Sequence, residues 1–318
     1  MTPAYSVIFF TVASGAGYGL LTWLSVAYLA NWWTPNAQGF VPGAIALCLG
    51  VVLIVAGLMS SMLHLGHPER AWRALSQWRT SWLSREGVLA TLGLIPITLF
   101  VGGWLWAPER ILMLRMSALA TIVFSLSTVL CTAMIYASLK PIPRWHNPWV
   151  PPVYLGFALA SGAVIAMCVR AFADTAPTSF MIGTLALLIG VWILKILYWR
   201  HSDAQDSTST IGSATGLDAL GDITQLDAPH TAANYLQKEM GFVVARKHAT
   251  RLRRMAILLG AALPSLVLFE ILMTEGFLHD ILLLIGTASV MFSLCIERWL
   301  FFAEAKHVVT LFYGEKSV

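Results

Sequence analysis

Eight apolar segments, each about 20 residues long, dominate this sequence and restrict what it can fold into. We place them at 7–30, 41–63, 87–106, 112–136, 153–172, 180–199, 255–273 and 278–302. Inside lipid, only α-helices and closed β-barrels satisfy every backbone hydrogen bond, and continuous apolar runs of this length indicate helices. The sequence therefore predicts an all-α integral membrane protein, a bundle of about eight transmembrane helices that forms a single membrane domain over residues 1–318.

The composition leaves little room for a soluble domain. Hydrophobic residues make up 58% of the chain and charged residues 11%, whereas soluble domains contain about a quarter charged residues. The four cysteines lie singly inside apolar segments, without the spacing of metal ligands. We interpret them as packing residues and expect neither a metal site nor a disulfide.

Lys and Arg are unequally distributed between the two sides of the predicted bundle. Seventeen of the 20 lie on or near the side that holds the N-terminus, and three, Arg110, Arg115 and Arg170, lie on the other side. Positively charged loops remain in the cytoplasm. Because the number of predicted spans is even, we expect both termini to be cytoplasmic in a multi-pass protein of the inner (cytoplasmic) membrane.

Two polar connections stand out on the predicted cytoplasmic side. The first covers 64–86, where Pro68 is typical of a helix start. Apolar residues then follow with helical spacing, at Ala71, Leu75, Trp78 and Trp82, which predicts a short interfacial helix. The second connection covers 200–254, and we interpret its later part, 231–254, as a basic amphipathic helix on the membrane surface.

The strongest candidate for chemistry lies at the two ends of the first connection. His64 ends the second predicted span and Glu86 begins the third, so we expect both at the same depth on neighbouring helices. Histidine titrates near neutral pH, so this pair could exchange protons with a ligand held between the helices. Arg85 could hold the carboxylate or a ligand oxygen. The remaining members of this candidate set are His67, Arg70 and Trp72.

Each of these residues also has a purely structural interpretation. His64 could bond lipid headgroups or cap its helix, and Glu86 could complement the positive N-terminus of a helix. A second cluster, Glu297, Arg298 and Glu304, lies in and just after the last apolar segment. It predicts a buried ion-pair network, for which the alternative is an ion pair that only orients the helix. For His64 and Glu86, ionisable residues at membrane depth favour a functional role, but these two lie at the rim and not at the centre.

Several other classes of site are disfavoured. All eight histidines lie at rims or in loops, whereas a b-type haem usually takes axial His ligands from within the spans. We therefore expect no haem, and leave open only a rim haem on His64 or His307. No Gly-rich phosphate loop is present, and the net charge of +4 reflects the cytoplasmic loops, so we expect no nucleic-acid partner.

Three motifs carry a family resemblance that extends over essentially the whole sequence. They are Ser60-Ser-Met-Leu-His-Leu-Gly-His-Pro-Glu-Arg-Ala-Trp-Arg-Ala-Leu and Trp82-Leu-Ser-Arg-Glu, with Glu297-Arg-Trp-Leu-Phe-Phe near the C-terminus. The first two resemble the DmsC-type membrane anchor of dimethyl sulfoxide reductase, and also the related anchor of the cytoplasmic sulfite-oxidising enzyme of sulfur bacteria. The third is a weaker match.

The resemblance implies a role as a non-catalytic anchor subunit. Such anchors bind a quinone (menaquinone or ubiquinone) and carry no haem. They hold a four-cluster iron–sulfur subunit, which contacts a molybdopterin catalytic subunit, so both of those cofactors belong to partners on the cytoplasmic side. The family's functional histidine falls on His64 and its acidic residue on Glu86.

Two departures from the sulfoxide-reductase anchor favour the sulfite-oxidising branch. Arg85 stands where that anchor has a neutral residue, and the 200–254 connection is a long insertion. Electrons would run from sulfite to quinone in the sulfite branch, and from quinol to substrate in the sulfoxide branch. The rival interpretations are a transporter or a passive anchor. Transporters favour broken spans and mid-membrane charges, and here we note only Pro96 and Pro264 as single interruptions.

Overall fold

The computed structural model describes residues 4–63, 65–173, 177–204, 209–221, 223, 226–227, 244–273 and 278–313. Within these residues it contains helices and no β-strand, and eight of the helical segments are long and apolar enough to cross a membrane. The predicted all-α membrane bundle is therefore confirmed. The assignment of its ends to the two sides of a membrane remains a prediction.

Seven of the spans are single α-helices: α1 (Tyr5–Leu29), α2 (Phe40–Met62), α3 (Trp82–Trp106), α4 (Ile111–Ala137), α5 (Val150–Ala171), α6 (Thr178–Ala204) and α11 (His279–Ala303). The other span is built from α9 (Val244–Ile257), a π-helical turn η3 (Leu258–Ala262) and α10 (Leu263–Met273). The shorter elements are η1 (Pro68–Gln77), α7 (Ile211–Thr215), η2 (Asp218–Leu220) and η4 (Val308–Tyr313).

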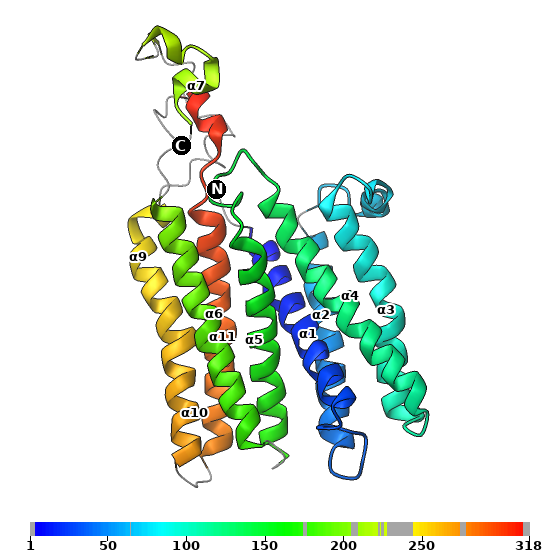
Figure 1. Ribbon diagram of the computed structural model, residues 1–318. Helices are drawn as coiled ribbons and strands as arrows, with labels where there is room; N and C mark the ends of the chain where they lie inside the picture. The colour runs from blue at the N-terminus through cyan, green and yellow to red at the C-terminus, as the bar shows by residue number, and fades with distance from the viewer. Residues whose placement is uncertain are drawn as a thin grey trace.

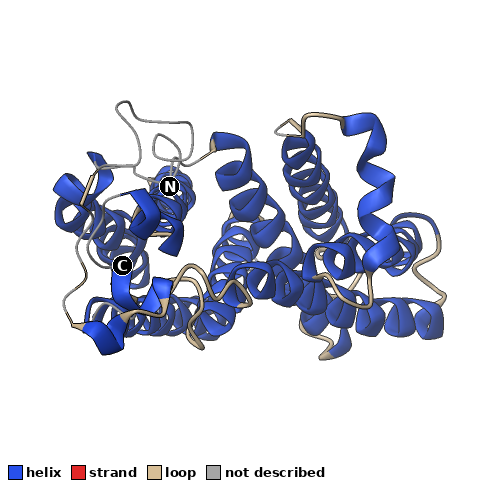
Figure 2. Cartoon of the chain, turned by 90° about the horizontal axis from the view of Figure 1, so that it is seen from above, coloured by secondary structure: helices blue, strands red, loops and turns tan. Residues whose placement is uncertain are grey.

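The spans run alternately up and down and form an elongated bundle. In Figure 1, α3 and α4 lie at one end, α6, α9, α10 and α11 lie at the other, and α1 and α5 pack between them. Figure 2 shows the same elongation from above. The start of α1 and the end of α11 lie at the same end of the bundle, as do η1 and α7. We call this end the upper rim.

The centre of the bundle is held by direct contact between two helix backbones. A Cβ atom added at Gly162 of α5 would overlap the backbone of Gly19 on α1, and one added at Gly19 would overlap the backbone at Ala158. Small residues allow helices to approach this closely in lipid, where packing rather than the hydrophobic effect drives association. This contact fixes the position of α1, which carries part of the candidate site.

The predicted surface helix at 231–254 differs from the structure. Residues 231–243 lie outside the described residues, and 244–254 form most of α9, which continues through η3 and α10 as the seventh span. The physical reason is that α9 packs Ala249, Leu252 and Ala256 against the core of the bundle, while Arg251 and Arg254 stay exposed. Arg253 bonds to Asp203 and Glu304 there.

The π-helical turn changes the hydrogen bonding of this span, and α11 compensates for it. Ser289 Oγ donates to the carbonyl oxygen of Leu259 at 2.6 Å, and Ser293 Oγ donates to that of Ala256 at 2.7 Å. Backbone groups inside a membrane need partners within the protein. Two serines on one face of α11 therefore supply hydrogen bonds around the turn.

The helix predicted in the first connection is present, but it is shorter than its apolar pattern suggests. η1 is a 3₁₀ helix that begins at Pro68, with His67 at its N-cap, and ends at Gln77. Trp82, which the pattern assigned to the same face, instead begins α3. Leu75 of η1 packs close to Gly87 of α3, so η1 is held against the upper end of that span.

Candidate functional site

A cavity of about 520 Å³ lies beneath η1 at the upper rim, between α1, α2, α3 and α4. We call it the rim cavity. Most of its wall is apolar, and Ser61, His67, Arg70, Glu86 and Tyr136 are its polar members. The other lining residues are Val7, Phe10, Leu58, Met62, Leu65, Gly66, Ala71, Ala74, Leu75, Leu83, Gly87 and Ile135. A largely apolar cavity of this size with a few polar groups is typical of a site for a small organic molecule.

Glu86 is the acidic residue in the described lining of the rim cavity. Ser81 caps α3 by accepting a hydrogen bond from the backbone N–H of Ser84, and this start places Glu86 in the second turn. Its side chain is 5% exposed and accepts a hydrogen bond from Thr132 Oγ1 on α4. Among the described residues, no Lys or Arg lies within ion-pair distance of this carboxylate.

His67 and Arg70 contribute to the outer edge of the rim cavity. Nδ1 of His67 lies 3.0 Å from Oε1 of Glu69, and Nε of Arg70 lies 3.7 Å from the same oxygen. Both side chains are more than half exposed. The structure thus brings together three of the residues predicted for the site, with Glu86 inside and His67 and Arg70 toward solvent.

The other members of the predicted set lie elsewhere. Arg85 donates hydrogen bonds to the carbonyl oxygens of Trp78 (3.0 Å) and Arg79 (2.7 Å), and its guanidinium stacks on Trp82. It therefore ties the end of the first connection to α3, and it does not line the rim cavity. Trp72 is exposed and lies outside the lining. His64 lies outside the described residues.

Tyr136 was not predicted from the sequence. It lies in the last turn of α4, lines the rim cavity and stacks on Tyr154 of α5 with 5.9 Å between ring centroids. Its position at the rim end of a span, level with Glu86, was a usable signal. The surrounding apolar run made it look like an ordinary packing residue.

A second polar site lies deeper, between α6 and α11. Lys195 and Glu297 form an ion pair of 2.5 Å, and Arg298 Nε lies 3.4 Å from the other oxygen of Glu297. We call these three residues the buried charge cluster, since each is at most 3% exposed. We counted Lys195 with the charges of the N-terminal side, near the end of the predicted span 180–199, and it lies inside α6, nine residues before the end of that helix.

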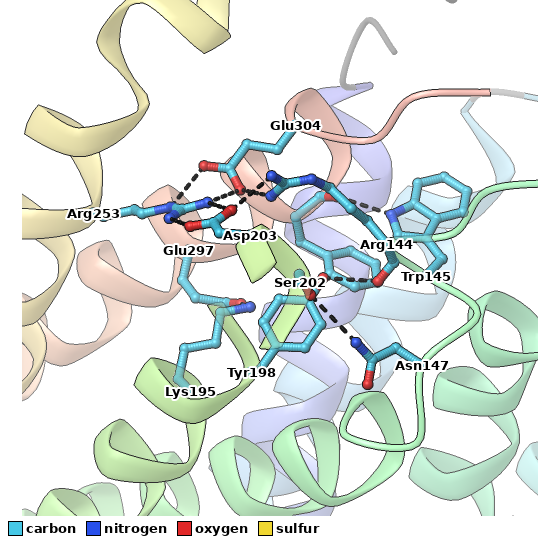
Figure 3. A network of polar contacts seen from close by, with 11 residues as sticks. Arg144, Trp145, Asn147, Lys195, Tyr198, Ser202, Asp203, Arg253, Glu297 and Glu304 are labelled. Carbon is cyan, nitrogen blue, oxygen red and sulfur yellow. Dashed lines mark hydrogen bonds and ion pairs between the residues drawn. The ribbon is translucent and has the colours of Figure 1, made fainter. Parts of the chain in front are cut away.

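Glu304 belongs to a separate group at the upper rim, which we call the rim cluster (Figure 3). Arg144 donates to Glu304 (2.9 Å) and to Asp203 (2.7 Å). Arg253 donates to both acids as well. The network predicted from Glu297, Arg298 and Glu304 is therefore divided between two clusters. Tyr198 lies beside both, with Lys195 over its ring and its hydroxyl donating to the Arg144 carbonyl.

The histidine that follows α11 is partly buried. Nδ1 of His307 accepts a hydrogen bond from the backbone N–H of Val309 at 3.0 Å. Burial lowers the pKa of His307 and so favours the neutral ring. Among the described residues, no group of three or more His, Cys, Asp or Glu side chains is arranged to hold a metal ion.

The comparisons with known proteins agree with one another. The sequence model of the DMSO reductase anchor subunit family matches residues 1–314. The C subunit of the sulfite dehydrogenase of Allochromatium vinosum is 32% identical, with 98% of this sequence and 99% of the relative covered. Two anaerobic dimethyl sulfoxide reductase proteins of Escherichia coli K12 match over less of the length. They are YnfH (25% identical, covering 65% of this sequence and 74% of the relative) and the C chain (31%, covering 49% and 52%).

Proposed function

Because this protein belongs to the family of DMSO reductase anchor subunits, we propose that it binds a membrane quinone in the rim cavity and passes electrons between that quinone and a partner subunit. The membership itself makes it a multi-pass membrane anchor of an oxidoreductase. The observation that carries the proposal is the rim cavity, an apolar space of about 520 Å³ with one buried carboxylate.

The lining of the rim cavity fits a quinone. A quinone has an apolar ring and tail and two carbonyl oxygens that accept hydrogen bonds. The apolar wall suits the ring, while Arg70, His67 and the Tyr136 hydroxyl are donors available at the lining. A bound quinone supplies two-electron chemistry that takes up or releases two protons. The site therefore needs a group that exchanges protons.

Glu86 is that group in our proposal. It is the carboxyl of the lining, and Thr132 holds one of its oxygens so that the other can face the cavity. General acid–base catalysis requires such a positioned group within hydrogen-bond reach of the reacting atom. His67 and Arg70, at the outer edge, would connect the cavity to water. The role that the sequence assigned to His64 remains a prediction.

The relatives favour an assignment to the sulfite branch. The match with the sulfite dehydrogenase relative covers nearly the whole of both proteins, whereas the matches with the two sulfoxide reductase proteins cover 65% and 49% of this one. We infer that electrons run from sulfite, through a molybdopterin subunit and an iron–sulfur subunit, to the quinone. The partners would dock on the upper rim, on the cytoplasmic side of the inner membrane.

The experiment compares Glu86→Gln with the wild-type complex in membranes. We expect quinone-coupled sulfite oxidation to fall by at least tenfold, because general acid–base groups contribute about 10²–10⁴-fold to rate. Oxidation with an artificial acceptor that bypasses the anchor should not change. Glu109→Gln, at an exposed site between α3 and α4, is the matched control. Normal quinone coupling in Glu86→Gln would refute the site.

A further inference from the structure

A second, much smaller cavity lies next to Glu86, between α1, α4, α5 and α11. Its volume is about 20 Å³, enough for one ordered water molecule. Thr132, which bonds Glu86, lines one part of it, and Tyr154 and Arg298 line another. The small cavity therefore lies between Thr132, the hydrogen-bond partner of the Glu86 carboxylate, and Arg298 of the buried charge cluster.

Two polar groups of this small cavity have unfilled hydrogen-bonding capacity. The Tyr154 hydroxyl and Nη1 of Arg298 are buried and have no hydrogen-bond partner among the described residues. Arg298 is otherwise held by Glu297 and by the ring of Tyr154, 3.6 Å from its guanidinium carbon. A guanidinium N–H that is buried in the bundle without a partner is costly. A water in this cavity could accept from Arg298 and donate to Thr132.

The buried charges balance only when both sites are counted together. Lys195 and Arg298 share the single carboxylate of Glu297, so the buried charge cluster carries one excess positive charge. Glu86 carries a buried carboxylate with no cation in ion-pair distance among the described residues. The rim cluster is neutral on its own, with two arginines and two acids.

We propose that Arg298 is a positioning residue for Glu86: through the water of the small cavity, the excess positive charge of the buried charge cluster sets the pH at which Glu86 takes up its proton. This inference rests on the proposed function in one respect, that the proton of Glu86 is exchanged with a quinone. The titration that tests the inference does not depend on a quinone.

The other groups around Glu86 are less suited to this role. His67, Arg70 and Arg85 are at least partly exposed, so water and salt screen their charges. The groups from α1, α4 and α5 are Tyr18, Cys131, Thr132, Tyr136 and Tyr154, whose side chains are ordinarily uncharged at pH 7. On α2, the described polar residue of the cavity is Ser61. Arg298, in contrast, is a buried cation, and it belongs to the described lining of the small cavity.

The test is an infrared titration of the full complex in lipid. The band of the protonated Glu86 carboxyl is assigned by its loss in Glu86→Gln, and its midpoint pH is measured in each variant. Arg298→Gln and Lys195→Gln each remove one buried positive charge and should raise the midpoint by about one pH unit, a typical size for the effect of a nearby buried charge. Arg298→Lys keeps the charge and should leave the midpoint near that of the wild type.

Arg253→Gln is the matched control, because it removes a positive charge from the partly exposed rim cluster. We expect a clearly smaller shift there. An unchanged midpoint in Lys195→Gln, or an equal shift in Arg253→Gln, would overturn the proposal. If Arg298→Gln does not fold, Lys195→Gln and Arg298→Lys decide the matter. Failure of the quinone assignment would appear separately, as normal quinone turnover in Glu86→Gln.

Discussion

Nζ of Lys195 lies 2.5 Å from Oε1 of Glu297, at a depth where both side chains are almost fully excluded from solvent. Removing one partner of a buried ion pair leaves the other uncompensated and costs about 3–5 kcal/mol. Glu297→Gln leaves both Lys195 and Arg298 without their carboxylate. We predict a loss of stability in that range, measured as a lower apparent melting temperature in lipid nanodiscs. Glu109→Gln, at an exposed site, should melt like the wild type.

The two acidic residues of the rim cluster differ in burial, and we predict that they differ in their contribution to stability. Glu304 is 7% exposed and receives hydrogen bonds from both Arg144 and Arg253, whereas Asp203 is 42% exposed. Solvent screens partly exposed ion pairs. Glu304→Gln should therefore destabilise the protein by about 2 kcal/mol, and Asp203→Asn by less than about 1 kcal/mol. Equal melting temperatures for the two variants would contradict the burial difference.

The contact between α1 and α5 depends on glycine. A Cβ at Gly162 would overlap the backbone of Gly19, and backbone atoms cannot move aside as a flexible side chain can. Gly162→Ala should lower the free energy of unfolding by about 1–3 kcal/mol and reduce the amount of folded protein in the membrane. Gly190→Ala in α6 is the control, since a Cβ there meets no atom within 4 Å. Quantitative immunoblotting of membranes and thermal melting measure both.

The rim cavity can be filled without touching Glu86. Ala71 lies on η1 and lines the cavity, so Ala71→Trp should occupy space needed by a quinone and reduce quinone-coupled turnover at least tenfold, in line with a loss of binding above about 1.4 kcal/mol. Ser76→Trp adds the same side chain to an exposed position of η1 that does not line the cavity, and should retain turnover. Both variants are assayed in membranes with equal amounts of complex.

The spans were predictable because hydropathy alone distinguishes a membrane helix from a soluble one. The pairings were not. Lys195 lies four residues before the predicted end of its span, where a lysine commonly extends to the rim. Its actual partner, Glu297, comes from a span about 100 residues later, and nothing in one sequence links the two. The split between Glu297 and Glu304 likewise depends on Arg144, in a loop 160 residues away from Glu304.

The candidate site shows the same limit at the level of single side chains. The sequence placed Glu86 and Arg85 together, but adjacent residues on a helix point in different directions. Glu86 faces the cavity, whereas Arg85 binds the backbone of the preceding connection. Proline also had less effect than its usual role suggests, because α3 continues through Pro96.

The most direct test of the account is to locate the quinone. A photoreactive quinone analogue is cross-linked to the complex in membranes, and the labelled peptides are identified by mass spectrometry. We predict labelling within 58–87 and at 135–136, the segments that line most of the rim cavity, with loss of labelling when excess natural quinone is added. Labelling confined to the apolar groove of about 260 Å³ formed by Tyr5, Ile8, Leu252, Cys295, Ile296 and Trp299 would contradict the account.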